Sequence, residues 1–390
     1  MYSDRLKPLP PYLFSKLDDA KEAAIKMGVD VIDLGVGDPD QPTHPHIIES
    51  LLLAAKDPKN HRYPSYIGMP SFREAVSDWY KKVKKVDLDP AKEVIALIGS
   101  KEGIAHTPFA FLNRGDVALV PDPAYPVYFN STILADGIPH IMPLIEENDF
   151  KPVFEDIDSN IAKKAKLLFI NYPNNPTSAT ADKSFFKDVV DFAKDNGIIV
   201  CHDNPYSEIT YDGYEAHSFL SVEGARDVGI EYYSLSKTYN MTGWRVGAAL
   251  GNPDVLAGIG KIKTNIDSGI FQAVQVAACE ALNGPQDCVQ DKNRMYKERR
   301  DAVICGLNKM GWGARVPKAT FYVWAHSPAG YDSILASGLL LEKAGVVATP
   351  GVGFGKHGEG FLRFALTESV ERINEAFERM ESLDFVSAKR

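Results

Sequence analysis

The stretch YYSLSKTYNMTGWRVG, residues 232–247, ends a short apolar run close to a lysine and several anion-binding side chains. Lys237 follows an expected strand, and ligands of open α/β sheets collect at the carboxyl ends of strands. A lysine desolvated at such a place has a lowered pKa and can form a Schiff base with an aldehyde. Ser234, Ser236 and Arg245 add two hydroxyls and a forked cation, which suit a phosphate group. Taken singly, Lys237 also fits an exposed loop, and the serines fit an ordinary turn.

A second candidate phosphate site lies in ALIGSKEGIAH, where Ser100 and Lys101 open a helix directly after an apolar strand. The free backbone N–H groups and the dipole of a helix start favour an anion. Simple capping of the helix by Ser100 is the alternative. Two anion sites and one buried lysine together suggest a phosphorylated aldehyde cofactor.

Polar side chains also follow two other expected strands. Asp203 ends the run GIIVCHD, Tyr206 lies in the next turn, and Asn175 lies in NYPNNPTS after the preceding strand. A buried aspartate can hold a proton on a pyridine nitrogen and keep the ring an electron acceptor. Tyrosine and asparagine can donate hydrogen bonds to a ring hydroxyl. Each of these residues alone also fits a turn or a helix cap.

The segments between these residues have the pattern of a mostly parallel sheet covered by helices on both faces. Short apolar, β-branched runs alternate with longer runs of helical period. Seven strands are expected, at residues 94–98, 117–120, 140–142, 167–170, 198–201, 232–234 and 246–250. Helices are expected at residues 71–83, 101–111, 125–135, 184–195 and 254–263. Together they predict a large α/β domain over residues 40–285.

The ends of the chain predict a smaller α+β domain. Within residues 286–390, a charged helix is expected over 287–310, strands over 321–325 and 361–365, and a final helix over 369–380. Residues 1–39 contain the proline-rich LKPLPPYLFSKL, which is too short for a core of its own. We expect them to form an arm and part of the small domain.

The composition excludes several classes of protein. With 390 residues, 45% of them hydrophobic, the chain can bury a large core. A formal charge of −9 argues against a nucleic-acid or anionic-membrane surface. Four scattered cysteines without a C-x-x-C pair indicate neither a disulfide framework nor a zinc site, and no metal is expected. Without a signal peptide or a membrane-spanning run, a soluble, cytoplasmic protein is expected.

The candidate residues, taken in order, resemble a known family. Asn175-Pro176-Thr177, Asp203 with Tyr206, Ser234-x-Ser236-Lys237 with Arg245, and Arg363 in FLRFALTES are similar to the class I and II aminotransferases. These enzymes have the aspartate aminotransferase fold (fold type I) and depend on pyridoxal 5′-phosphate. The resemblance covers nearly the whole chain.

Further strings are similar to one branch of that family, which acts on LL-2,6-diaminopimelate. They are LPPYLFSKL, DLGVGDPD, YPSYIGMPSFREA, LIGSKEGIAH and DPAYPVY. The branch implies amino transfer between glutamate with 2-oxoglutarate and tetrahydrodipicolinate with LL-2,6-diaminopimelate, in lysine biosynthesis. Alanine, aspartate or another amino acid remains an alternative substrate.

The resemblance implies a role for each matching residue. Lys237 would carry the cofactor and move a proton as general acid–base, and Asp203 would pair with the ring nitrogen. Arg363 would hold the substrate α-carboxylate through two parallel hydrogen bonds. Further cofactor contacts are implied for Ser100, Lys101, Tyr125, Asn175, Tyr206, Ser234, Ser236 and Arg245, and further substrate contacts for Tyr12, Gly37, Lys101, Tyr125 and Asn175. Tyr63 would reach the phosphate in the neighbouring subunit, which implies a homodimer with shared active sites.

Two other stretches limit this interpretation. Residues 263–272, KTNIDSGIFQ, contain no arginine where some aspartate aminotransferases bind a second carboxylate, and Gly269 stands where plant-type diaminopimelate enzymes have asparagine. Another group must therefore contact the far end of the substrate.

The glycine-rich TPGVGFGKHGEG has Lys356 and Pro350 where nucleotide-binding motifs need glycine, which argues against a dehydrogenase or kinase. A regulator without activity would be expected to lack Lys237 or Arg363.

Overall fold

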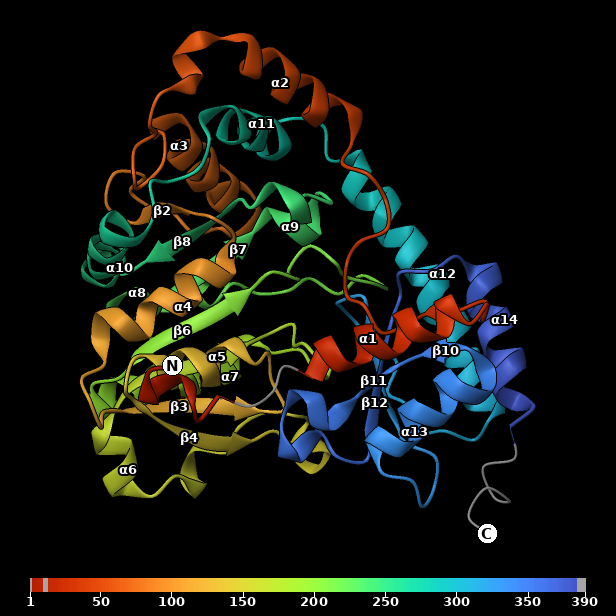
Figure 1. The fold of residues 1–390 in the computed structure, drawn as a ribbon. Helices are drawn as coiled ribbons and strands as arrows, with labels where there is room; N and C mark the ends of the chain where they lie inside the picture. The colour runs from red at the N-terminus through yellow and green to blue at the C-terminus, as the bar shows by residue number, and fades with distance from the viewer. Residues whose placement is uncertain (1, 10–12, 384–390) are drawn as a thin grey trace.

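A computed structural model describes residues 2–9 and 13–383, so Tyr12 lies outside the described residues. Seven strands form the large sheet in the order β2 (Val94–Leu97), β8 (Gly247–Gly251), β7 (Gly229–Ser234), β6 (Ile199–Asn204), β5 (Ala165–Asn171), β3 (Val117–Asp122) and β4 (Ile138–Pro143) (Figure 1). Only β8 runs against its neighbours in this sheet. The predicted seven-stranded, mostly parallel sheet is therefore confirmed.

Successive residues of the central strands point into two different hydrophobic cores, one on each face of the sheet. In β3, Val117 and Leu119 belong to one core, whereas Ala118 and Val120 belong to the other. The first face is covered by α3 (Pro70–Trp79), α7 (Lys183–Asn196) and α11 (Gln272–Asn283); the second is covered by α4 (Ser100–Phe111), α5 (Val127–Leu134) and α10 (Pro253–Ile266). Strands buried on both faces read as continuous apolar runs, which is why their positions were predictable.

Among the helices that were not predicted, two pack against each other and contribute residues to the first core. They are α2 (Pro45–Lys56) and α11 (Gln272–Asn283). In α11, the buried residues include Ala273, Ala277, Ala278 and Ala281, so its buried surface consists largely of small side chains. Such a surface produces a weak apolar stripe in the sequence. Short helices α6 (Ser159–Lys164), α8 (Ala225–Val228) and α9 (Leu235–Thr238) complete this part of the chain.

A smaller unit follows, built on a three-stranded antiparallel sheet. Its strands lie in the order β11 (Thr349–Pro350), β12 (Phe361–Ala365) and β9 (Tyr322–His326), with helices α12 (Asp287–Lys309), α13 (Ser333–Leu339) and α14 (Val370–Glu381). One hydrophobic core joins Leu307 of α12, Val323 of β9, Phe364 of β12 and Phe377 of α14. Among the described residues, no helix is both long enough and apolar enough to cross a membrane.

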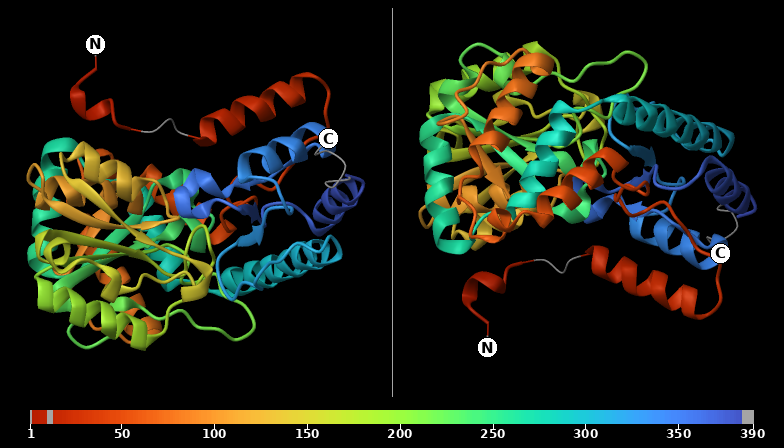
Figure 2. Two further views of the ribbon diagram at one scale, coloured as in Figure 1. Left: turned by 90° about the horizontal axis from the view of Figure 1, so that it is seen from below. Right: turned by 90° about the horizontal axis from the view of Figure 1, so that it is seen from above.

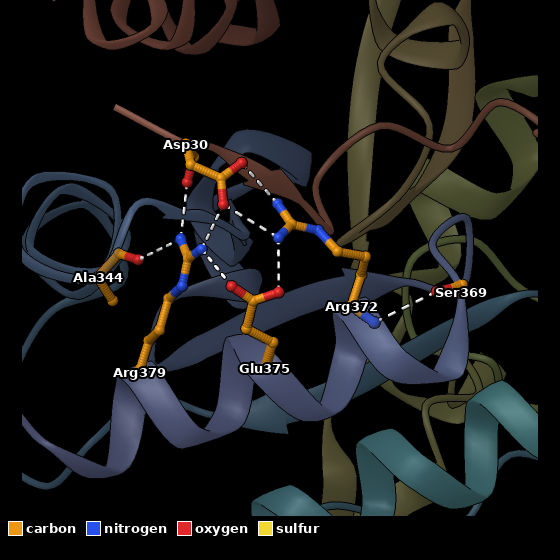
Figure 3. A network of polar contacts seen from close by, with 6 residues as sticks. All are labelled: Asp30, Ala344, Ser369, Arg372, Glu375 and Arg379. Atoms are coloured by element: carbon orange, nitrogen blue, oxygen red, sulfur yellow. Dashed lines mark hydrogen bonds and ion pairs between the residues drawn. The ribbon is translucent and has the colours of Figure 1, made fainter. Parts of the chain in front are cut away.

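The segment from α1 to β1 packs on this smaller unit, whereas η1 (Asp4–Leu6) contacts α5. Strand β1 (Ile32–Asp33) pairs with β10 (Val346–Val347), and α1 (Leu13–Lys26) lies beside the same unit (Figures 1 and 2). Figure 3 shows Asp30 between Arg372 and Arg379 of α14, with ion-pair distances of 2.8 and 2.5 Å. The two guanidinium groups lower the pKa of Asp30. Because this carboxylate is largely exposed, the contact mainly fixes where the chain enters β1.

Candidate active site

The carboxyl ends of the parallel strands and the smaller unit enclose one cavity of about 260 Å³. It is lined by every described candidate residue except Tyr63, namely Gly37, Ser100, Lys101, Tyr125, Asn175, Asp203, Tyr206, Ser234, Ser236, Lys237, Arg245 and Arg363. Segments far apart in the sequence therefore meet at the strand ends, as expected for an open α/β sheet. Tyr63 lies outside the cavity on the surface, with 88% of its area exposed.

Lys237 stands on the short helix α9, directly after β7. The side chain of Ser234 accepts a hydrogen bond from the backbone N–H of Ser236 and so caps this helix. Lys237 Nζ donates to the carbonyl oxygen of Gly37 at 2.9 Å. Burial lowers the pKa of Lys237 to about 8; the charges of Arg363 and Arg245 also lower it, and the charge of Asp38 opposes them. The amine is therefore available as a nucleophile near neutral pH.

This pKa predicts that Lys237 destabilises the protein without cofactor. At pH 7 the unfolded chain, with an ordinary lysine pKa of 10.5, holds the proton more tightly than the folded protein does. Lys237→Met should therefore raise the free energy of unfolding of the apoprotein at pH 7. The expected net gain is roughly 1–2 kcal/mol, because loss of the hydrogen bond to Gly37 offsets part of the effect. The gain should shrink as the pH rises from 8 and disappear above 10.5. Urea unfolding at pH 7 and at pH 11 measures both values, and an equal gain at both would contradict the prediction.

Asp203 lies one residue before the end of the central strand β6, and only one of its two carboxylate oxygens has a hydrogen-bond partner in the described part of the chain. Tyr128 donates its hydroxyl hydrogen to Asp203 Oδ2 at 2.6 Å. Asp203 Oδ1 is buried and has no hydrogen-bond partner among the described residues. Burial raises the pKa of Asp203 to about 6, while the Tyr128 hydrogen bond and the charge of His202 oppose this rise. An unsatisfied buried carboxylate oxygen beside the cavity indicates a missing donor from a ligand.

Arg363 lies in the middle of β12 and is only 3% exposed. Its Nη1 donates to Asn175 Oδ1 and its Nη2 donates to the carbonyl oxygen of Gly35, each at 2.8 Å. The guanidinium also lies 4.2 Å from the ring centre of Tyr322 and 4.6 Å from that of Phe354. A planar cation held in this way is suited to a carboxylate in the cavity.

The residues expected to bind a phosphate lie near the start of α4. Ser100 opens this helix, and Ser234, Ser236 and Arg245 line the same cavity. Arg245 adopts a left-handed backbone conformation, with φ of 57°, and donates to the carbonyl oxygen of Thr242 at 2.8 Å. The helix start and the nearby guanidinium both favour an anion at this place.

Gly99, which precedes α4, is needed for this arrangement. It has φ of +76°, and a Cβ atom there would overlap Arg245 Nη2 and lie 2.9 Å from Arg245 Cζ. We expect Gly99→Ala to displace this guanidinium and weaken binding of pyridoxamine 5′-phosphate about tenfold, or ~1.4 kcal/mol. Gly115→Ala is the matched control, since Gly115 has φ of +87° and nothing within 4 Å of its Cβ position. Equal binding by the two variants, measured by calorimetry, would contradict the steric explanation.

The sequence analysis missed several residues in or beside the cavity, among them Asn171, Tyr128 and Tyr322. Asn171, at the end of β5, donates to the Asp203 carbonyl oxygen at 2.7 Å and accepts from the Asn175 backbone N–H at 2.8 Å. Tyr128 holds Asp203, and the Tyr322 hydroxyl lies 3.3 Å from that of Tyr206. The position of Asn171 directly after an expected strand could have revealed it. The two tyrosines look like ordinary core residues in the sequence.

Comparisons with known proteins agree with this site. The family model described as aminotransferase class I and II matches residues 29–380. The LL-diaminopimelate aminotransferase of Syntrophobacter fumaroxidans is 56% identical over 383 residues, which cover 98% of this chain and 99% of that protein. The protein of the same name from Desulforudis audaxviator is 56% identical and covers 96% of each chain. The solved structure of apo-BacF from Bacillus subtilis has a TM-score of 0.95 at 39% identity, covering 99% of this chain and 98% of that one.

Members of this family use pyridoxal 5′-phosphate, and the cavity fits that molecule. The unpartnered Asp203 Oδ1 matches a protonated ring nitrogen, and Lys237 Nζ is a nucleophile for the aldehyde. Ser100 at the start of α4 and Arg245 would provide donors for the phosphate. The chain therefore belongs to the class I and II aminotransferases, and its cofactor is pyridoxal 5′-phosphate.

Proposed function

We propose that this aminotransferase interconverts tetrahydrodipicolinate and LL-2,6-diaminopimelate, with glutamate and 2-oxoglutarate as the other pair. The observation that carries the proposal is the 56% identity, over 98% of this chain, to a protein named LL-diaminopimelate aminotransferase. The reaction belongs to lysine biosynthesis. All four cysteines are unpaired, which supports a reducing cytoplasm as the location.

Lys237 and Asp203 would do the chemical work at the two ends of the cofactor ring. The bound cofactor supplies an aldehyde carbon that takes up the amino group and a ring that accepts the electrons of the substrate Cα–H bond. Lys237, whose pKa is about 8, would take the proton from the substrate Cα and return one to the former aldehyde carbon of the cofactor. Asp203, through its free Oδ1, would keep a proton on the ring nitrogen. Both roles require the desolvation that the structure gives these groups.

Arg363 would bind the α-carboxylate of every substrate. Its guanidinium is fixed by Asn175 and Gly35, so little side-chain entropy is lost on binding. Gly37 belongs to the same wall, where a Cβ atom would overlap the Tyr322 hydroxyl and lie 2.8 Å from Tyr322 Cε1. The lack of a side chain at this position therefore leaves room for the Tyr322 ring, which also lines the cavity. Tyr125 and Lys101, whose Nζ lies 5.7 Å from the Tyr125 ring centre, would contact both cofactor and substrate.

A panel of amino acids tests the substrate assignment. The enzyme carrying pyridoxal 5′-phosphate is mixed with LL-2,6-diaminopimelate, glutamate, alanine or aspartate, and conversion of the cofactor is followed by visible absorbance. We expect LL-2,6-diaminopimelate and glutamate to react fastest. A rate for alanine or aspartate that exceeds that of diaminopimelate by orders of magnitude would overturn the assignment and leave the family unchanged.

We further propose a homodimer in which Tyr63 completes the phosphate site of the other subunit. Tyr63 is 88% exposed and does not line its own cavity. Phe271, which is 44% exposed, lies nearby, with its ring centre 5.8 Å from that of His61. The two segments lie together, because Gln272 Nε2 donates to the carbonyl oxygen of Arg62 at 3.3 Å. An exposed apolar surface of this kind is typical of an interface between subunits.

Mixing two inactive variants tests this shared site. A dimer of one Lys237→Ala subunit and one Tyr63→Ala subunit contains one site with both wild-type residues. We expect the mixture to regain activity after subunit exchange, to about half the wild-type value per mixed dimer. A monomer in sedimentation experiments, or no recovery in a mixed dimer, would contradict the proposal.

A further inference from the structure

A second buried lysine lies directly behind the helix that carries Lys237. Lys292, on α12, is 6% exposed. Its Nζ donates to the carbonyl oxygen of Lys237 at 2.7 Å and also to the carbonyl oxygen of Thr238. Both carbonyls lie at the carboxyl end of α9. The ammonium group thus contacts the backbone of the candidate catalytic lysine itself.

These carbonyls belong to a helix too short to hold itself in place. A helix of four residues has terminal carbonyls that lack partners within the helix. The following turn satisfies the earlier carbonyls, because Tyr239 N donates to Leu235 O and Met241 N donates to Ser236 O, each at 3.0 Å. The carbonyls of residues 237 and 238 are bound by Lys292. This side chain therefore completes the hydrogen bonding of α9.

The same helix, α12, also fixes the loop that accepts the Lys237 side chain. Arg299, seven residues after Lys292 and thus on the same helix face, binds Asp40 through two hydrogen bonds of 2.7 and 2.8 Å. Asp40 lies three residues after Gly37, and the carbonyl oxygen of Gly37 accepts the hydrogen bond from Lys237 Nζ. One face of α12 therefore fixes both the backbone beneath Lys237 and the loop that its Nζ contacts.

We propose that Lys292 is a positioning residue that holds α9 so that Lys237 Nζ reaches the reacting carbon. The proposal rests on the catalytic role of Lys237 given above. Burial lowers the pKa of Lys292 to about 7. A neutral amine still has two N–H donors, so the two contacts do not depend on its protonation.

Lys292→Met tests the proposal, because methionine keeps much of the apolar length and removes both donors. We expect kcat to fall about tenfold, with KM for the amino acid changed by less than about twofold. The attachment of pyridoxal 5′-phosphate to the apoprotein, followed by stopped-flow absorbance, should also slow about tenfold, because this step requires a correctly placed Lys237. The Kd of pyridoxamine 5′-phosphate, which binds without attachment, should change less than about twofold. Lys292→Arg retains donors and should recover part of the attachment rate.

Lys84→Met is the matched control for loss of a buried lysine. The Lys84 side chain is 7% exposed and its Nζ lies 2.5 Å from Glu208 Oε1. This control should lose stability while keeping the attachment rate. If Lys292→Met attaches the cofactor as fast as wild type, or if it loses pyridoxamine 5′-phosphate binding to the same extent as attachment, the positioning role is wrong. Failure of the proposed catalytic role would show differently, as retained activity in a variant of Lys237.

Discussion

Lys237→Ala should lower kcat/KM by about 10⁴-fold or more for every amino acid. The variant loses the group to which we assign the roles of nucleophile and proton carrier, a desolvated amine of pKa about 8 on α9. Borohydride treatment of the wild type should fix the cofactor to this residue and bleach the visible band. In the variant, mass spectrometry should find no covalently fixed cofactor.

The variant should still bind the cofactor without attachment. Asp203 and the candidate phosphate-binding residues Ser100 and Arg245 should remain in place, because they lie outside α9, the helix that carries Lys237. Binding of pyridoxamine 5′-phosphate is thus the control for an intact site. A variant that keeps both this binding and more than about one hundredth of the wild-type activity would refute the role of Lys237.

The large sheet was predictable because its strands are buried on two sides. The first four residues of strand β3, VALV, belong to the two cores in alternation, so this part of its sequence is continuously apolar. The antiparallel direction of β8 was not predictable from such a run, since a two-sided burial pattern is the same in either direction. Short pairings such as β1 with β10 have two residues each and carry no periodicity. The pairing of β1 with β10 depends on a contact between segments more than 300 positions apart.

The candidate site was predictable where chemistry limits the residue type. A nucleophilic lysine and a carboxylate at a strand end have few substitutes, so Lys237 and Asp203 could be proposed from type and position, whereas Arg363 was proposed from the family resemblance. Tyr128 and Lys292 could not, because each acts through a contact between distant segments. Tyr128 lies in a helix that also contributes apolar packing, and Lys292 is one of several charged residues in α12. The roles that we assign to them rest on the hydrogen bonds of Tyr128 to Asp203 and of Lys292 to the carbonyl oxygen of Lys237.

Asp203→Asn should reduce kcat/KM about 10³-fold while the cofactor stays attached to Lys237. The substitution hardly changes the volume of the side chain, but it removes the negative charge of the carboxylate, whose Oδ1 has no hydrogen-bond partner among the described residues. An amide cannot hold a proton on the ring nitrogen, so the ring accepts electrons less readily. Single-turnover rates with glutamate and the visible spectrum of the same sample measure the two effects separately.

Tyr128→Phe separates the charge of Asp203 from its orientation. This variant removes the 2.6 Å hydrogen bond to Oδ2 and leaves the carboxylate in place. Since that bond lowers the pKa of Asp203 against the effect of burial, its loss should raise the pKa above the present value of about 6. Activity should then fall only about tenfold and should recover partly at higher pH, where the carboxylate is ionised again. Asp203→Asn has no group to ionise, so its loss should not recover with pH. If both variants lose activity equally at all pH values, orientation of the side chain and not its charge is what the reaction requires.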